Sequence, residues 1–214
     1  MDIRYENKDI CKKCGGQCCK KSGCDYFVSD FENMSTNYLE EFLKQGHASI
    51  VALLDVNELN GKYIIEPVLT LRARNRNRDI VDLVSMKTEC MSLTETGCKF
   101  DISKRPSGGA TFMPKEVGRC EETVSKLEEV KKFLPYQRTL QRLVKRFTGM
   151  SYDAKIKEDV ENLIYDILSK NFEGVHELEI QEMVNFFPIL IQAYPEEALK
   201  AKKRFNANQL VKKK

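Results

Sequence analysis

Five of the chain's eight cysteines lie within the fourteen residues CKKCGGQCCKKSGC, which run from Cys11 to Cys24. The other three also precede residue 121, so the C-terminal part of the chain contains none. A chain of 214 residues, 42% of them hydrophobic, is long enough to bury a well-filled core and does not need sulfur merely to stay folded. The cluster therefore predicts a chemical role for the thiols.

The redox state of these cysteines depends on the compartment. The first twenty-five residues contain no apolar segment of the length that a signal peptide needs, and no run approaches the roughly 18 apolar residues of a membrane span. We therefore expect a soluble cytoplasmic protein with no membrane partner. Disulfides are rare in that compartment, so clustered cysteines there usually bind a metal or act as redox thiols.

The spacing of the N-terminal cysteines favours metal binding. Thiolate suits zinc, iron and iron–sulfur clusters, and Cys11-x-x-Cys14 allows two sulfurs from one tight turn to reach one metal. Neighbouring side chains on extended backbone point in opposite directions, so Cys18 and Cys19 would serve two metal atoms, or two faces of one cluster, more easily than one ion. Two alternatives remain open, namely buried free cysteines and disulfides.

The later cysteines are expected to complete the site. CMSLTETGC predicts a hairpin whose turn at Thr96-Gly97 presents Cys98, and KRPSGGATFMP predicts an ordered, turn-rich loop. All eight cysteines are thus candidate ligands of zinc or iron: Cys11, Cys14, Cys18, Cys19, Cys24, Cys90, Cys98 and Cys120.

Two further elements are predicted before residue 122. Apolar residues at helical spacing predict a short helix from Thr36 to Gln45, capped by Ser35 or Thr36 and stopped by Gly46. Two β-prone runs joined at Asn60-Gly61 predict a type I′ hairpin over residues 49–74. Pro67 indicates that its strand lies at an edge or carries a bulge.

The C-terminal part has the apolar spacing of helices. One run predicts a helix over about residues 153–168, a second from residue 180 to 191 is expected to break or kink at Pro188, and Pro195 is placed to start a last helix. We therefore expect a predominantly helical α+β fold, with a cysteine-cluster metal-binding module over residues 1–122 that contains the β-hairpin. A C-terminal helical bundle over residues 123–214 is expected to pack on it and to end in a basic tail.

The order of these motifs resembles the YkgJ-type cysteine-cluster family, whose members are described as zinc- or iron-chelating domains. The resemblance covers about residues 8 to 122 and consists of C-x-x-C-G-G-x-C-C, then C-x-x-L-T-E-x-G-C, then R-P ahead of a last cysteine. The matching positions are Cys11, Cys14, Cys18, Cys19, Cys90, Leu93, Gly97, Cys98, Arg105, Pro106 and Cys120.

The resemblance implies a chelated metal but leaves its identity and any activity open. The chain differs from the compact form of the family in the insertion GGATFMPKEVGR before Cys120 and in the extra donor Cys24. The N-terminal cluster is also similar to the cysteine-rich region of flagellin lysine methylases, although we identify no methyl-donor motif.

Arginines recur with period two in LTLRARNRNRD, which on a continuing strand would place them on one face. Such a stripe would contact phosphates or offset the charge of a thiolate cluster, and the alternative is a solvated strand face. The residues are Arg72, Arg74, Arg76 and Arg78. The net charge of +3 gives little general attraction to nucleic acid.

No catalytic motif is recognisable. His47 is a weaker candidate ligand, and His176 is expected at a helix start or on the surface. Three functions therefore remain: a thiolate metal-binding protein with an unidentified protein partner, an iron-sulfur or iron-dependent enzyme or redox component acting in protein modification, and a zinc-stabilised nucleic-acid binder.

Overall fold

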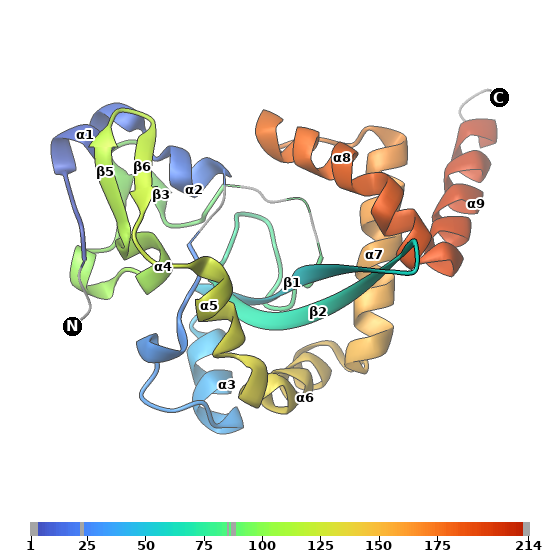
Figure 1. Cartoon of the computed structure of the whole chain (residues 1–214), viewed down its shortest axis with the longest axis horizontal. Helices are drawn as coiled ribbons and strands as arrows, with labels where there is room; N and C mark the ends of the chain where they lie inside the picture. The colour runs from blue at the N-terminus through green and yellow to red at the C-terminus, as the bar shows by residue number, and fades with distance from the viewer. Residues whose placement is uncertain (1–3, 22–23, 85, 87–88, 212–214) are drawn as a thin grey trace.

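The computed structural model describes residues 4–21, 24–84, 86 and 89–211. The fold is α+β, with helices surrounding small antiparallel sheets. A long hairpin crosses the centre of the molecule, the cysteine-containing elements gather at one end of it, and α7, α8 and α9 lie at the other (Figure 1). One hydrophobic core cluster includes residues from both the cysteine-containing part and the C-terminal helices. The predicted division near residue 122 remains a prediction.

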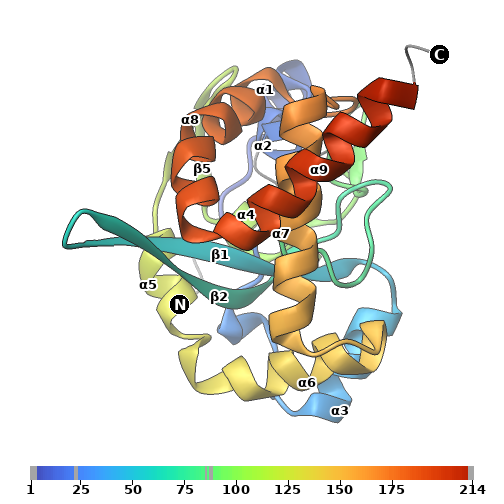
Figure 2. The same ribbon diagram turned by 90° about the vertical axis from the view of Figure 1, so that its right-hand side faces the viewer.

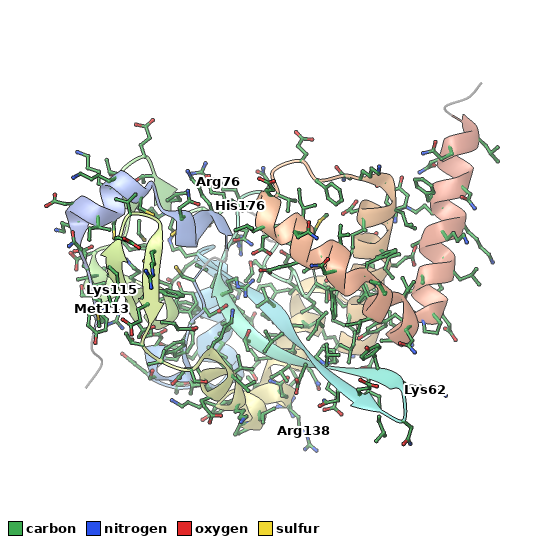
Figure 3. All side chains as sticks on the ribbon, turned by 45° about the horizontal axis from the view of Figure 1, so that its top comes forward. Lys62, Arg76, Met113, Lys115, Arg138 and His176 are labelled. Atoms are coloured by element: carbon green, nitrogen blue, oxygen red, sulfur yellow. The ribbon has the colours of Figure 1, made fainter. Side chains whose placement is uncertain are left out.

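The central hairpin consists of β1 (Ala48–Leu59) and β2 (Lys62–Ala73), and it confirms the predicted range. Asn60 and Gly61 connect the strands with φ angles of 54° and 72°, as a type I′ turn requires. The inner half of the hairpin is buried, whereas its outer half is largely exposed. The tip, next to Lys62, projects from the body of the molecule (Figures 2 and 3).

Pro67 occupies an edge strand, as predicted, at a position where it costs no hydrogen bond. The backbone N–H groups of Ile50 and Ala52 point away from β2 and donate to Ile80 O and Leu83 O. Because the ladder alternates, the pair formed by Leu54 and Pro67 also lies at a non-hydrogen-bonded position. The missing N–H of the proline therefore leaves no β1 carbonyl without its expected donor.

The hairpin is held from below by α3 (Thr36–Lys44) and α6 (Gln137–Thr148), which contact each other (Figure 1). The predicted first helix is confirmed, with Ser35 as its N-cap. On α6, the Gln137 side chain donates to Leu69 O and accepts from Leu69 N–H, both at 2.9 Å. It thus continues the hydrogen bonding of β2 on the side that faces away from β1.

The remaining C-terminal elements are α5 (Lys126–Lys131), a 3₁₀ turn at Leu134–Tyr136, α7 (Tyr152–Ser169), α8 (Glu177–Ala193) and α9 (Pro195–Val211). The predictions of α7 and of the start of α9 at Pro195 are confirmed. At Pro188 the chain does not break, because α8 continues through this residue, and the alternative of a kink stays a prediction. Within the described chain, no helix is both long and apolar enough to cross a membrane.

The cysteine-rich part consists of short elements: α1 (Lys8–Cys14), α2 (Gln17–Lys21), the β3 (Leu93–Thr94) and β4 (Gly97–Cys98) hairpin, a 3₁₀ turn at Ile102–Lys104, α4 (Ser107–Ala110), and the β5 (Phe112–Glu116) and β6 (Arg119–Glu122) hairpin. Met113 and Lys115 mark β5 in Figure 3. The predicted hairpin at Cys98 is present, although its turn residues are Glu95 and Thr96.

Two local predictions in this part are wrong. CKKCGGQCCKK is mostly helical, so the extended geometry assumed for Cys18 and Cys19 does not apply. Asn7 caps α1 by accepting from Ile10 N–H at 3.0 Å, and Gly15 ends the helix with φ of 63°. The expected loop KRPSGGATFMP contains α4 and the start of β5.

Candidate thiolate metal centre

Cysteines from four separate segments line one cavity of about 530 Å³. Cys11 comes from α1, Cys19 from α2, Cys24 from the segment after α2, and Cys98 from β4. Of the other predicted ligands, Cys90 is buried beside Cys19, whereas Cys14 and Cys120 are not among the lining residues and Cys120 is exposed on β6. The side chain of Cys18 lies outside the described part of the chain.

Cys24 is fixed by the central hairpin. Its carbonyl accepts from Ala73 N–H at 2.8 Å, and two residues later Tyr26 N–H donates to Leu71 O at 2.9 Å. The segment thus runs along the outer edge of β2, and Cys24 is 4% exposed. The additional donor predicted beyond the family signature is therefore a buried thiol at the cavity wall.

The two glycines of α4 allow this helix to approach the Cys24 segment. A Cβ atom on Gly109 would lie within 3.0 Å of Cys24 Sγ, and one on Gly108 would lie 2.5 Å from Asp25 O. Gly108 N–H donates to the same Asp25 carbonyl at 3.0 Å. The sequence predicts this glycine pair within a turn-rich loop, whereas in the structure it lies in α4 and permits close packing against the Cys24 segment.

Cys19 and Cys90 are in direct contact. Cys90 N–H donates to Cys19 O at 2.9 Å, and a hydrogen bond with the Cys19 side chain lowers the pKa of Cys90, with a further contribution from Ser92 N–H at 3.4 Å from Cys90 Sγ. Burial raises the pKa of Cys98, and Arg105 opposes that change. Cys90 should therefore lose its proton more readily than Cys98.

Arg105 is the least exposed of the four cationic side chains that line this cavity. Its Nη2 donates to Glu6 Oε1 at 2.9 Å, while its buried Nε has no hydrogen-bond acceptor in the part of the chain that the structure describes. Burial alone would lower the pKa of Arg105, but Cys98, Glu6 and Cys24 raise it. A buried N–H group close to two thiols is suited to donate a hydrogen bond to a thiolate.

The thiols line the same cavity, but their sulfur atoms are not arranged around a single point as metal ligands would be. Within the described residues, no group of three or more His, Cys, Asp or Glu side chains has the arrangement of a metal site. The donor types nevertheless fit a soft metal ion, and the unsatisfied Arg105 Nε fits a negatively charged thiolate beside it. The residues present therefore suit a thiolate-bound metal.

The predicted arginine stripe does not form. β2 ends at Ala73, so the strand that would align the side chains does not continue. Each guanidinium is instead engaged within the chain: Arg72 with Asp25, Arg74 with Ala48 O, Arg76 with Leu93 O and Glu89, and Arg78 with Met86 O and Asp82. The geometric basis for a phosphate-binding stripe is therefore absent.

The two histidines lie outside the thiol cavity. The His47 ring packs edge-on against Phe100, with centroids 5.7 Å apart, and Phe100 lines the cavity. His176 begins α8 as its N-cap and accepts from Leu178 N–H, so its predicted place is confirmed.

The sequence did not predict two residues of this site and one residue beside it. Arg105 has no predicted role beyond the R-P pair, and Gly109 is predicted only within a turn-rich loop. Asp25, which follows Cys24, pairs with Arg72 and Lys126. The R-P and G-G pairs were the available signals. Asp25 had none, because its partners Arg72 and Lys126 are distant in sequence.

No protein-family model, curated protein or solved structure matches the chain. The resemblance to the YkgJ-type family therefore remains a prediction based on the motifs.

Proposed function

We propose that this protein binds a zinc or iron ion, or an iron–sulfur cluster, through thiolates in its cysteine-rich part. The observation that carries the proposal is the convergence of Cys11, Cys19, Cys24 and Cys98 on one cavity. Three of these cysteines come from the fourteen-residue cluster, whereas Cys98 lies 74 positions after Cys24, so the meeting of Cys98 with the other three is a property of the fold. Of the remaining cysteines, Cys14, Cys18 and Cys90 stay candidate ligands, whereas this proposal leaves out Cys120, which is exposed and is not among the lining residues.

The charges around the cavity support an anionic metal–thiolate centre. Four thiolates around a divalent ion carry net negative charge, and the cavity is lined by four cationic side chains against two carboxylates. The cations are Lys8, Lys12, Lys99 and Arg105, and the carboxylates are Glu6 and Asp101. This balance suits a charged centre better than a set of neutral thiols.

The main role of the metal in this proposal is structural, because it would link the segments that supply the cysteines. A metal would connect α1, α2, the Cys24 segment and β4, and its binding energy would then contribute to folding. Under this proposal the metal-binding part presents a rigid surface to a protein partner, with the cysteine-rich module and the C-terminal helices acting as one folded unit.

A second candidate is an iron-dependent enzyme or redox component acting in protein modification. Structural zinc sites are usually closed, whereas a cavity of about 530 Å³ is larger than a single ion needs. An iron ion or cluster would supply redox chemistry or an open coordination position to a group entering this cavity. The chain's own contribution would come from Arg105 and the lysines, whose positive charges would offset the negative charge of the metal–thiolate centre.

Metal and acid-labile sulfide analysis, with a visible absorption spectrum, tests these proposals on protein purified without oxygen and without an affinity-tag metal. Zinc without sulfide or colour supports the structural site, and iron with sulfide and a reductant-bleached band supports the second candidate. Protein that contains no tightly bound metal, and gains none from added zinc or ferrous ion, contradicts both.

The cysteines give matched variants for the same measurement. Cys24→Ser and Cys98→Ser should each lower the metal content several-fold, because their thiols line the cavity. Cys120→Ser is the control, because this residue is exposed on β6 and is not among the lining residues. Equal loss from all three variants would remove the assignment of the site to this cavity.

A further inference from the structure

A second cavity, separate from the thiol cavity, lies between the hairpin and the C-terminal helices. It has a volume of about 230 Å³ and is bounded by β1 at residues 51–54, by residues 82–84, and by side chains of α7 and α8. An apolar cavity of about 150 Å³ is enough to admit benzene, so this one has room for a ring with a substituent. No described cysteine lines it.

Most of its wall is apolar. Leu163 on α7 and Met183 and Phe186 on α8 face the β1 residues Val51 and Leu54 across the cavity. Met183 and Phe186 are only partly buried, so this part of the apolar wall is accessible to solvent. An apolar ring placed between them would bury surface that the protein alone leaves accessible to solvent.

The polar residues of the cavity include an acceptor without a donor. Asn75 lines the cavity and is 7% exposed, and its Oδ1 has no hydrogen-bond partner within the described residues. Its backbone is fixed by a bridge to Cys90. Because a buried acceptor without a donor is unfavourable, this oxygen marks a place for a ligand N–H or O–H group.

Arg72 supplies donors in the same cavity. Its Nε donates to Asp25 Oδ1 at 2.8 Å, and none of the described residues accepts a hydrogen bond from its Nη groups. Its charge is already opposed by Asp25, Glu179 and Asp82. The carboxylate of an anionic ligand would be repelled by these three carboxylates, so a neutral carbonyl is the better acceptor for Arg72.

We propose that this cavity binds a small neutral amide with a single-ring apolar body. The amide N–H donates to Asn75 Oδ1, the amide carbonyl accepts from Arg72 Nη, and the ring packs between Leu163, Met183 and Phe186. The proposal is independent of the metal site, since no cysteine takes part in it.

Titration of the full-length protein with benzamide, benzoate and toluene tests the proposal, with side-chain methyl NMR resonances as the readout. Benzamide should shift the methyl resonances of Leu163, Met183 and Val84 in a saturable manner. Toluene should bind more weakly, and benzoate least. Binding of benzoate as tight as that of benzamide, or no saturable shift with benzamide, would overturn the proposal.

Three variants sharpen the test. Asn75→Leu should weaken benzamide binding about tenfold while leaving toluene binding unchanged or tighter, because only the hydrogen-bond acceptor is lost. Met183→Trp should fill the cavity and abolish binding, whereas Val184→Trp, at an exposed position on the same helix, should not. If Asn75→Leu does not fold, Met183→Trp and Val184→Trp still test whether benzamide binds in this cavity. Equal binding of benzamide by these two variants would contradict the assignment of the site.

Discussion

A Cβ atom placed on Gly109 would lie within 3.0 Å of Cys24 Sγ, closer than real Cβ atoms approach a neighbouring atom. Gly109 is helical in α4 and its φ angle is not positive, so its need for glycine comes from space and not from backbone conformation. The helix after the R-P pair thus rests directly on a thiol of the proposed metal centre.

Gly109→Ala is therefore expected to displace Cys24 Sγ and to reduce the metal content of the purified protein. Elemental analysis of Gly109→Ala beside the unaltered protein measures this effect. In a Cys24→Ala background the same glycine substitution should cost less folding stability, because the nearest remaining contact is the residue 24 Cβ atom at 3.1 Å. Additive costs of the two substitutions would show that the contact is unimportant.

Asp25 should contribute stability that depends on pH. Burial alone would raise the pKa of Asp25, but Arg72 and Lys126, each 2.8 Å from one carboxylate oxygen, lower it from 3.8 to about 2. A lowered carboxyl pKa stabilises the folded state above the unfolded pKa, and this contribution is lost as the pH falls from about 4 to about 2. Asp25→Asn should therefore cost about 2 kcal/mol at pH 7 and much less near pH 2.

Denaturant unfolding at several pH values measures this difference, on chelator-treated protein so that metal loss does not contribute. Glu66→Gln, at an exposed position on β2, is the control and should have little effect. A cost for Asp25→Asn that stays constant from pH 7 to pH 2 would contradict the prediction.

Gln137 should be important for the attachment of α6 to the hairpin. Its side chain satisfies both backbone groups of Leu69, a residue with no exposed surface. Gln137→Ala leaves this N–H and C=O without partners, so the free energy of unfolding should fall by about 1–3 kcal/mol. Gln181→Ala removes only an exposed contact with Asn185 on α8 and should change the free energy of unfolding little. Similar costs for the two variants in chemical denaturation would exclude this role.

Asn60 should stabilise the hairpin through its backbone conformation. Its φ of 54° lies in the left-handed region, which asparagine and glycine tolerate better than alanine. Asn60→Ala should lower the unfolding free energy by about 1 kcal/mol, whereas Asn60→Gly should have little effect. Asn57→Ala, exposed on β1, provides the comparison in the same denaturation measurement. A loss from Asn60→Gly equal to that from Asn60→Ala would contradict the conformational explanation.

The elements with local signals could be predicted from the amino-acid sequence. α3 begins after Ser35 as predicted, the hairpin turns at Asn60-Gly61, and α9 starts at Pro195. Each of these features depends on residues within a few positions of one another, because caps, left-handed turns and first-turn prolines act through the nearest backbone groups.

Which cysteines share a cavity, and which residues surround them, depends on contacts between distant parts of the chain. Cys24 and Cys98 are brought together by the edge of β2 and by the β3–β4 hairpin, and Gly109 reaches Cys24 from a third segment. Arg72, predicted in a surface stripe, is instead buried against Asp25, forty-seven positions away in the chain. Such contacts depend on the closure of long loops and on the burial of charge, which no local pattern of residues records.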